Sequence, residues 1–266
     1  DDLLSEEHKL VRNAAREWVK REVSPIIEDA CEKAEFPKHL IGGLADIGAF
    51  GPYIPAKYGG AGLDQISYGL IMQELERGDS GIRSTSSVQS SLVMYPIWKY
   101  GNEDQKKKYL PNLASGKHLG AWGLTEPSTG SDAMRMRTVA KKEGDYWVIN
   151  GTKNFITHAI SGDVIVVVAR TGDLGDSRGI SAFIVDANND GVSSGKKENK
   201  LGMRASETAE LIFENCKVHQ SNILGNIGEG FLQAMKILDG GRISIAALSL
   251  GIAKGAYSAS LKYSKE

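Results

Sequence analysis

Cysteine is scarce in this chain, and neither sign of charge is in excess. The 266 residues include two cysteines, Cys31 and Cys216, which lie far apart and match no metal-binding spacing. The sequence therefore predicts free thiols rather than a disulfide framework, and no metal. The formal net charge of −1 shows no basic excess of the kind that indicates a nucleic-acid-binding protein.

Long apolar runs are also missing. No segment has the length and apolar character of a membrane span, and the first residues do not have the pattern of a secretory signal peptide. No membrane partner is therefore expected. With 41% hydrophobic and 24% charged residues, the composition is that of a globular protein with room for one large or two ordinary domains.

Three regions differ in their residue pattern. Residues 1 to about 116 have helical periodicity, with Ser5 as an expected N-cap and a kink expected at Pro96. Helices are predicted there at 39–47, 66–77, 84–100 and 103–110. Residues 118 to about 220 have strand-like runs at 163–169, 180–185 and 209–213, and Tyr146–Ile149 followed by Asn150-Gly151 predicts a hairpin. From Gly228 the chain is again predicted to be helical, at 231–238 and 243–263.

Two segments in the strand-rich region between the two helical parts carry the strongest functional signal. Residues 124–132 read LTEPSTGSD, and residues 150–157 read NGTKNFIT. The first offers backbone N–H groups and hydroxyls, which suit a phosphate or a polar ring edge. The second is interpreted as a turn leading to an aromatic side chain and a hydroxyl, which suit a flat ring. Together they predict a site for a large, flat, phosphorylated cofactor.

This pair of segments resembles the flavin-binding signature of acyl-CoA dehydrogenases, and the likeness extends over essentially the whole chain. The resemblance implies FAD as the cofactor and an α+β multidomain fold. Its expected parts are an N-terminal helical domain at 1–117, a middle β-barrel or sandwich domain at 118–226, and the first part of a C-terminal helical bundle at 227–266. In the family that last domain is longer, so the chain is expected to be a piece of a longer polypeptide.

By the same resemblance, Leu124 and Thr125 would face the isoalloxazine ring, with Thr125 donating a hydrogen bond near its reactive edge. Gly130 and Ser131 would lie near the pyrophosphate and the acyl-CoA, and Phe155 would pack on the flavin. The implied cofactor-binding set is Trp122, Leu124, Thr125, Gly130, Ser131, Phe155, Ile156 and Thr157. From the residues alone, the alternative is a polar turn and a core phenylalanine.

Two further segments point to the acyl-CoA. Asp239-Gly240-Gly241-Arg242 is, from the residues alone, a helix N-terminus with a capping Asp; the resemblance makes Asp239 and Arg242 contacts to CoA. Residues 76–84, ERGDSGIRS, resemble the acyl-pocket segment of glutaryl-CoA dehydrogenases, in which Arg83 and Ser84 would bind a distal carboxylate close to Glu76. A lone exposed loop arginine is the alternative. The implied substrate-binding set is Glu76, Arg83, Ser84, Val88, Ser131, Met235, Asp239 and Arg242.

The substrate class stays open at this point. Residues 1–120 resemble the glutaryl branch and residues 121–266 the short-chain, butyryl branch. The implied reaction is α,β-dehydrogenation of an acyl-CoA thioester in fatty acid or amino acid catabolism, with electrons passed to an electron-transfer flavoprotein. The resemblance also implies a homotetramer, in a bacterial cytoplasm or a mitochondrial matrix. The general-base glutamate is expected beyond Glu266, so residues 1–266 alone are expected to be inactive.

Three alternatives remain from the sequence. A truncated flavin- or CoA-binding protein without catalysis would share these motifs, and an acyl-CoA oxidase would differ in giving electrons to oxygen. A scaffold that binds neither ligand is disfavoured by the hydroxyls of Thr125, Ser131 and Thr157. His158 follows the flavin-packing segment and is interpreted as a lining residue rather than a base.

Overall fold

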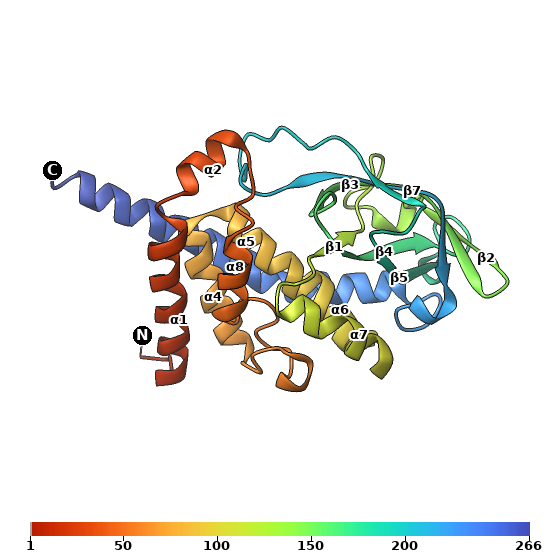
Figure 1. Ribbon diagram of the computed structural model, residues 1–266, viewed down its shortest axis with the longest axis horizontal. Helices are drawn as coiled ribbons and strands as arrows, with labels where there is room; N and C mark the ends of the chain where they lie inside the picture. The colour runs from red at the N-terminus through yellow and green to blue at the C-terminus, as the bar shows by residue number, and fades with distance from the viewer. Residues whose placement is uncertain (1) are drawn as a thin grey trace.

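The computed structural model describes residues 2–266, and its first part is helical (Figure 1). Polar side chains cap several of these helices: Ser5 accepts from the His8 amide, Asp64 from Ser67, and Asn102 from Gln105, as expected for N-cap residues. The expected cap at Ser5 is confirmed. The helices are α1 (Glu6–Trp18), α2 (Ile27–Lys33), α3 (Leu40–Asp46), α4 (Gln65–Gly78), α5 (Ser80–Ser87), α6 (Tyr95–Tyr100) and α7 (Glu103–Ala114).

The predicted single helix at 84–100 has a different construction. It begins at Ser80, because the Asp79 carboxylate accepts from the amides of Gly81 and Ile82. The segment Val88–Met94 between α5 and α6 is π-helical. Pro96 is the second residue of α6 and directly follows this π-helical segment. The irregularity expected at Pro96 therefore lies before it, and π-helical turns are rare and often mark functional sites.

The second part of the chain is a curled sheet of seven strands within residues 2–266. Val164–Arg170 is buried along its whole length, as a run of valines between two neighbouring strands predicts. It pairs in parallel with the first strand and antiparallel with the fifth. The strands are β1 (Gly120–Gly123), β2 (Val139–Glu143), β3 (Tyr146–Thr157), β4 (Val164–Arg170), β5 (Ile180–Asp186), β6 (Val192–Ser194) and β7 (Thr208–His219).

The hairpin predicted at Asn150-Gly151 is wrong. Strand β3 runs straight through these residues, because it pairs with β2 on one edge and with β7 on the other. The turn between β2 and β3 lies at Gly144, where φ is +60°. Gly151 instead marks a register shift against β7, and a Cβ there would lie 2.6 Å from Thr138 Cα. Its glycine is required by close approach, not by a turn.

The chain becomes helical again at α8, which spans Gly230–Tyr263 without a break. The two separate helices and the helix start expected at Asp239 are therefore wrong. Gly240 and Gly241 have low helix propensity, but packing of α8 against α4 outweighs it. The close contact is made at Gly251, where a Cβ would come within 2.6 Å of the Gln73 carbonyl oxygen. Figure 1 shows α8 running along both the helical part and the sheet, with its C-terminal end beyond α1 and α2.

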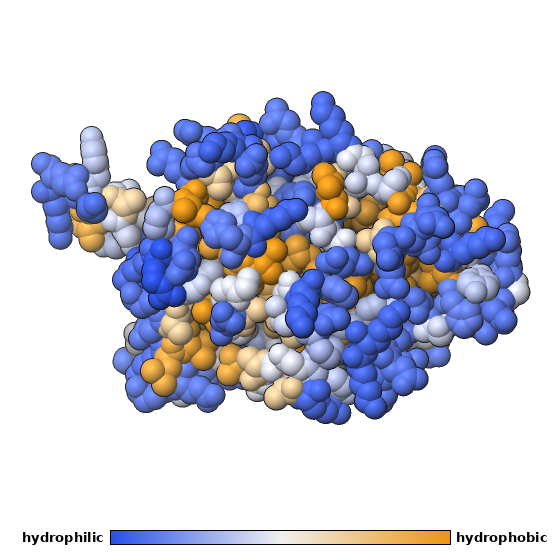
Figure 2. Space-filling model, in the orientation of Figure 1, coloured by the Kyte–Doolittle hydropathy of each residue, from blue (hydrophilic) through white to orange (hydrophobic). Residues whose placement is uncertain are grey.

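Hydrophilic residues cover most of the face shown in Figure 2, with smaller apolar areas between them. Among residues 2–266, no helix combines the length and apolar character needed to cross a bilayer. The sheet encloses its own core, built around Trp147, Phe183 and Phe213. A second core joins the helices to β1, β4 and β5, and so fixes the helical part against one side of the sheet.

Candidate functional site

The two segments that suggested a cofactor site lie against each other. The Asn154 amide donates to the Thr125 carbonyl oxygen at 2.8 Å. The Lys153 ammonium donates to the Leu124 carbonyl oxygen at 3.1 Å. Residues 124–132 form no α-helix and follow β1 as an irregular turn. The structure thus holds the hydroxyl-rich turn along the C-terminal half of β3.

A buried ion pair fixes this turn, and sequence reasoning missed it. Lys153 Nζ lies 2.8 Å from Glu126 Oε1, with side chains 0% and 3% exposed. The Glu126 carboxylate also accepts from the amides of Arg137 and Thr138. Burial lowers the pKa of Lys153 to about 8. Burial raises the pKa of Glu126, but the nearby ammonium and the N–H donors outweigh it, so its pKa is lowered. Both groups are therefore charged at neutral pH.

The predicted cofactor residues are split between solvent and core. Phe155 is 62% exposed and has a φ of +57°, which presents a flat apolar face to solvent beside the turn. Ser131 is exposed, and the space around Gly130 is open, with nothing within 4 Å of a Cβ built there. Thr125 and Thr157 are half-buried. Trp122, Leu124 and Ile156 are buried in the cores, so they support the site from beneath.

These features fit a flavin. The exposed aromatic face and the half-buried hydroxyls suit a planar ring with polar edges, and the open backbone at Gly130 and Ser131 suits a diphosphate. Among residues 2–266, no group of three or more His, Cys, Asp or Glu side chains is placed to hold a metal ion.

The residues predicted to bind the acyl group lie on α4 and α5. Arg83 is not on an exposed loop: its side chain is 5% exposed, and its Nε donates to Glu76 Oε2 at 2.7 Å. The expected proximity of Glu76 and Arg83 is confirmed. The Ser80 hydroxyl donates to the other oxygen of Glu76. The bond to Glu76 uses Arg83 Nε, so the two terminal nitrogens are the donors that a second carboxylate would meet.

A groove next to α5 opens between the π-helical segment and α8. It has a volume of about 490 Å³ and is lined by Ser87, Ser91 and Leu92 from one side and by Leu238, Arg242 and Ile245 from α8. The Arg242 side chain is 82% exposed and lies 3.6 Å from Asp239 Oδ1. A second groove, of about 580 Å³, contains Met235 together with Ser177 and Arg178. Helix α8 thus brings three predicted substrate residues, Met235, Asp239 and Arg242, to one surface.

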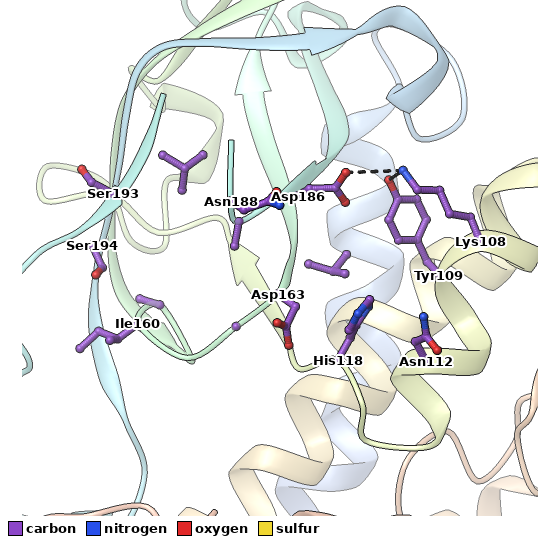
Figure 3. A pocket seen from close by; sticks show the side chains of 15 residues that line it. Lys108, Tyr109, Asn112, His118, Ile160, Asp163, Asp186, Asn188, Ser193 and Ser194 are labelled. Atoms are coloured by element: carbon purple, nitrogen blue, oxygen red, sulfur yellow. Dashed lines mark hydrogen bonds and ion pairs between the residues drawn. The ribbon is translucent and has the colours of Figure 1, made fainter. Parts of the chain in front are cut away.

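Another cavity, of about 630 Å³, lies at the seam between α7 and the sheet (Figure 3). Lys108 bonds to the Tyr109 hydroxyl at 2.8 Å and to Asp186 at 3.5 Å, and Ile160, Ser193 and Ser194 line the opposite side. Within residues 2–266, its lining includes none of the predicted cofactor or substrate residues. This cavity is therefore separate from the candidate site.

Two contacts place the acyl-side helix, which is α5 with the π-helical segment Val88–Met94, against the cofactor-side strands β1 and β3. Gln89, on the π-helical segment, accepts from the Gly120 amide at the start of β1 at 2.7 Å and donates to the His118 carbonyl oxygen at 2.8 Å. His158, which follows β3 directly, lies 3.1 Å from the Thr85 hydroxyl on α5. No sequence pattern indicated either contact, because both join residues far apart in the chain.

A scaffold of this kind, with a helical part, a curled middle sheet and a polar turn fixed beside an exposed aromatic residue, agrees with the sequence comparisons. The acyl-CoA dehydrogenase N-terminal domain matches residues 5–117, and the acyl-CoA dehydrogenase middle domain matches residues 121–216. The chain belongs to the acyl-CoA dehydrogenase family, which consists of FAD-dependent oxidoreductases.

Three similar proteins illustrate the range of the family. A short-chain specific acyl-CoA dehydrogenase of Clostridium acetobutylicum is 44% identical over 99% of this chain and 69% of its own length. The CarC subunit of a caffeyl-CoA reductase–Etf complex of Acetobacterium woodii is 42% identical over 98% and 69%. The crystal structure of a glutaryl-CoA dehydrogenase from Mycobacterium smegmatis with FADH2 superposes with a TM-score of 0.94 at 37% identity, over 99% and 66%.

Proposed function

We propose that the chain binds FAD along the turn 124–132 and the end of β3, and uses it to oxidise the Cα–Cβ bond of a short-chain or dicarboxylyl acyl-CoA. The observation that supports this most directly is the attachment of the turn to β3 beside the exposed Phe155. A fixed turn keeps hydrogen-bond donors in place before a ligand arrives, which is the arrangement that stabilises developing charge.

Each side chain then has a defined task. Thr125 donates a hydrogen bond to the flavin edge, where negative charge collects when the ring is reduced. Phe155 packs against the ring, and Gly130 and Ser131 approach the diphosphate through backbone N–H groups and a hydroxyl. Met235, Asp239 and Arg242 on α8 bind the CoA part of the substrate. FAD, when bound, supplies the acceptor for the hydride from the β-carbon, while the α-proton goes to a carboxylate base.

Arg83 is the residue on which the choice of substrate depends. In our proposal, its terminal nitrogens donate to the distal carboxylate of a glutaryl-type thioester, with Ser84 beside them. The Glu76–Arg83 pair is already neutral, so the carboxylate is held by directed hydrogen bonds more than by net charge. A butyryl-type thioester leaves these donors without a partner, which makes it the poorer substrate.

The electron acceptor we propose is an electron-transfer flavoprotein. The similarity to the Etf-complex subunit supports it. A homotetramer in a bacterial cytoplasm or a mitochondrial matrix completes the proposal.

The first test is a visible absorption spectrum of the natural gene product, followed by anaerobic addition of a thioester. We expect a flavin spectrum that bleaches with glutaryl-CoA and, at higher concentration, with butyryl-CoA. A protein without flavin after reconstitution with FAD, or a flavin that no acyl-CoA reduces, would contradict the proposal.

The substrate assignment is tested with the double variant E76Q/R83M. It removes both charges together, so that neither is left buried without a partner. We expect the preference for glutaryl-CoA over butyryl-CoA to fall by about 30-fold, the effect of a lost buried charge contact of about 2 kcal/mol, with butyryl-CoA turnover retained. The matched control is E74Q/R16M, which neutralises a second ion pair of α4 outside the proposed site. An unchanged ratio of the two rates in E76Q/R83M would exclude Arg83 as the carboxylate ligand.

A further inference from the structure

His158 joins the two halves of the candidate site. Its side chain is 1% exposed and lies 3.1 Å from Thr85 Oγ1 through Nε2 and 3.1 Å from Ser161 Oγ through Nδ1. Thr85 is on α5, next to Ser84. On the other side, His158 follows Thr157, the last residue of β3. One imidazole thus connects the acyl-side helix to the flavin-side strand.

Each hydroxyl that contacts the His158 ring also has a second acceptor. Thr85 donates to the Gly81 carbonyl oxygen at 3.2 Å, and Ser161 donates to Glu207 Oε1 at 3.1 Å. A neutral imidazole donates through one ring nitrogen and accepts at the other, so it can bond both hydroxyls at once. Burial lowers the pKa of His158 to about 4, which agrees with a neutral ring holding one proton. Both ring nitrogens are thereby used in structural bonds and are not available as a base.

The backbone at the end of β3 is strained, and the hydrogen bonds of His158 help to hold it. Phe155 and His158 have φ values of +57° and +58°, a region that side-chain-bearing residues adopt at an energetic cost. These two positions enclose Ile156 and Thr157. The His158 ring is also fixed from the side by the edge of Phe36, with ring centroids 5.3 Å apart. A side chain bonded at both ends therefore holds the strained end of β3 in one orientation.

We propose that His158 is a positioning residue, whose hydrogen bond to Thr85 sets the place of Arg83 and Ser84 relative to Phe155 and Thr157, and so the place of the acyl group against the flavin. This inference rests on the proposed function. It assigns His158 no contact with substrate or cofactor. Its effect is on the distance between two bound molecules, to which a transfer between them is highly sensitive.

The two bonds can be separated by substitution. The amide group of Asn places its oxygen or its nitrogen as many bonds from the backbone as Nδ1, and the amide group of Gln does the same for Nε2, so each can accept or donate the bond that it replaces. His158→Asn therefore keeps a partner for Ser161 and loses Thr85, and His158→Gln keeps Thr85. Thr85→Val removes the hydroxyl at constant shape, and Thr85→Ser restores it. Ser161→Ala removes the other bond alone.

The experiment measures flavin content, thermal midpoint, and kcat and KM for the thioester in the full natural protein. We expect H158N and T85V to lower kcat by about 10- to 100-fold, because a small displacement of the reacting groups has effects of that size. The double variant H158N/T85V should be no worse than either single one. H158Q, T85S and S161A should stay within about threefold of wild type, and KM should change little throughout, because the CoA contacts are intact.

Readouts other than turnover separate positioning from folding. The affinity of a non-oxidisable thioether analogue of butyryl-CoA, followed through the flavin spectrum, should be retained in H158N, and so should flavin content. Equal losses in H158Q and H158N, or losses that parallel a fall in melting temperature and flavin content, would overturn the inference alone. A wild-type protein that neither holds flavin nor is bleached would overturn the proposed function and this inference with it.

Discussion

The buried pair Glu126–Lys153 allows a quantitative test of how the flavin-side turn is held. Lys153→Met keeps the length of the side chain and removes its charge. The Glu126 carboxylate, 3% exposed, then keeps two backbone donors and loses its counter-ion. Removing one partner of a buried pair costs about 3–5 kcal/mol. In a chain of this size, that corresponds to a fall of about 10 °C in the melting temperature.

The double variant E126Q/K153M removes the charge that the single variant leaves behind. It should therefore be more stable than K153M, although the change of Glu126 to an amide replaces one of its two acceptor oxygens by a donor. Lys141→Met, at an exposed lysine of the neighbouring strand β2, is the control and should change stability by less than about 0.5 kcal/mol. Urea unfolding of the four proteins gives all the required free energies.

The pH dependence provides an independent check on the same pair. The pKa of Lys153 is about 8 in the folded chain, below the ordinary value of 10.5, so the unfolded chain binds more protons between these values. The stability of the wild type relative to K153M should therefore rise with pH across this window, by about 3 kcal/mol in total. A K153M variant that costs less than about 1 kcal/mol, or one no less stable than E126Q/K153M, would refute the reasoning.

Three other measurements follow from single residues. The pKa of His158 is lowered to about 4 by burial, so between pH 6.5 and 4 the unfolded chain binds a proton that the folded chain does not. The free energy of unfolding should therefore fall by about 3 kcal/mol as the pH is lowered through that window. Urea titrations at several pH values should show a smaller fall for H158Q. Gly42→Ala, where a Cβ meets open space, should raise stability by about 0.5–1 kcal/mol, whereas Gly43→Ala, whose Cβ would lie 2.6 Å from Trp18 Nε1, should lower it by about 1–3 kcal/mol; equal thermal shifts would contradict this. Asp64→Ala removes the N-cap of α4 and should cost about 1 kcal/mol in the same assay, while Asp64→Asn should be nearly neutral.

Much of the fold could be predicted from periodicity, and the errors have a common cause. Helix α4 and strand β4 were predicted to within a residue or two, because a regular pattern and a capping residue or a run of valines define them locally. Asn150-Gly151 and Gly240-Gly241 are strong local signals for a turn and a helix break. Both are overruled by neighbours distant in sequence: β2 and β7 on either side of β3, and α4 along α8. Helix α2 was not predicted, although its seven residues equal those of α3, which was.

The candidate site was predictable where its residues form contiguous motifs. The proximity of Glu76 and Arg83 was expected, and the structure confirms it; their burial was not, because the spacing of two charged residues on adjacent helices does not report exposure. The Lys153–Glu126 pair and the His158–Thr85 bond join residues 27 and 73 positions apart. A buried lysine in a strand gives no periodic signal of its own, so only the folded chain shows what it pairs with.

The number of residues in the π-helical segment Val88–Met94 has a consequence for the helix that follows it. A wider turn accommodates more residues than an α-helical turn does, so the segment behaves as an insertion absorbed inside a helix. Deleting one residue from it would let the helix continue as regular α-helix, with the buried face of α6 still towards the core. Inserting one residue into a regular α-helical turn of α5 would instead rotate everything beyond it by about 100°, and the buried face of α6 would leave the core. The wider turn thus lets this helix contain an extra residue without turning α6 away from the core.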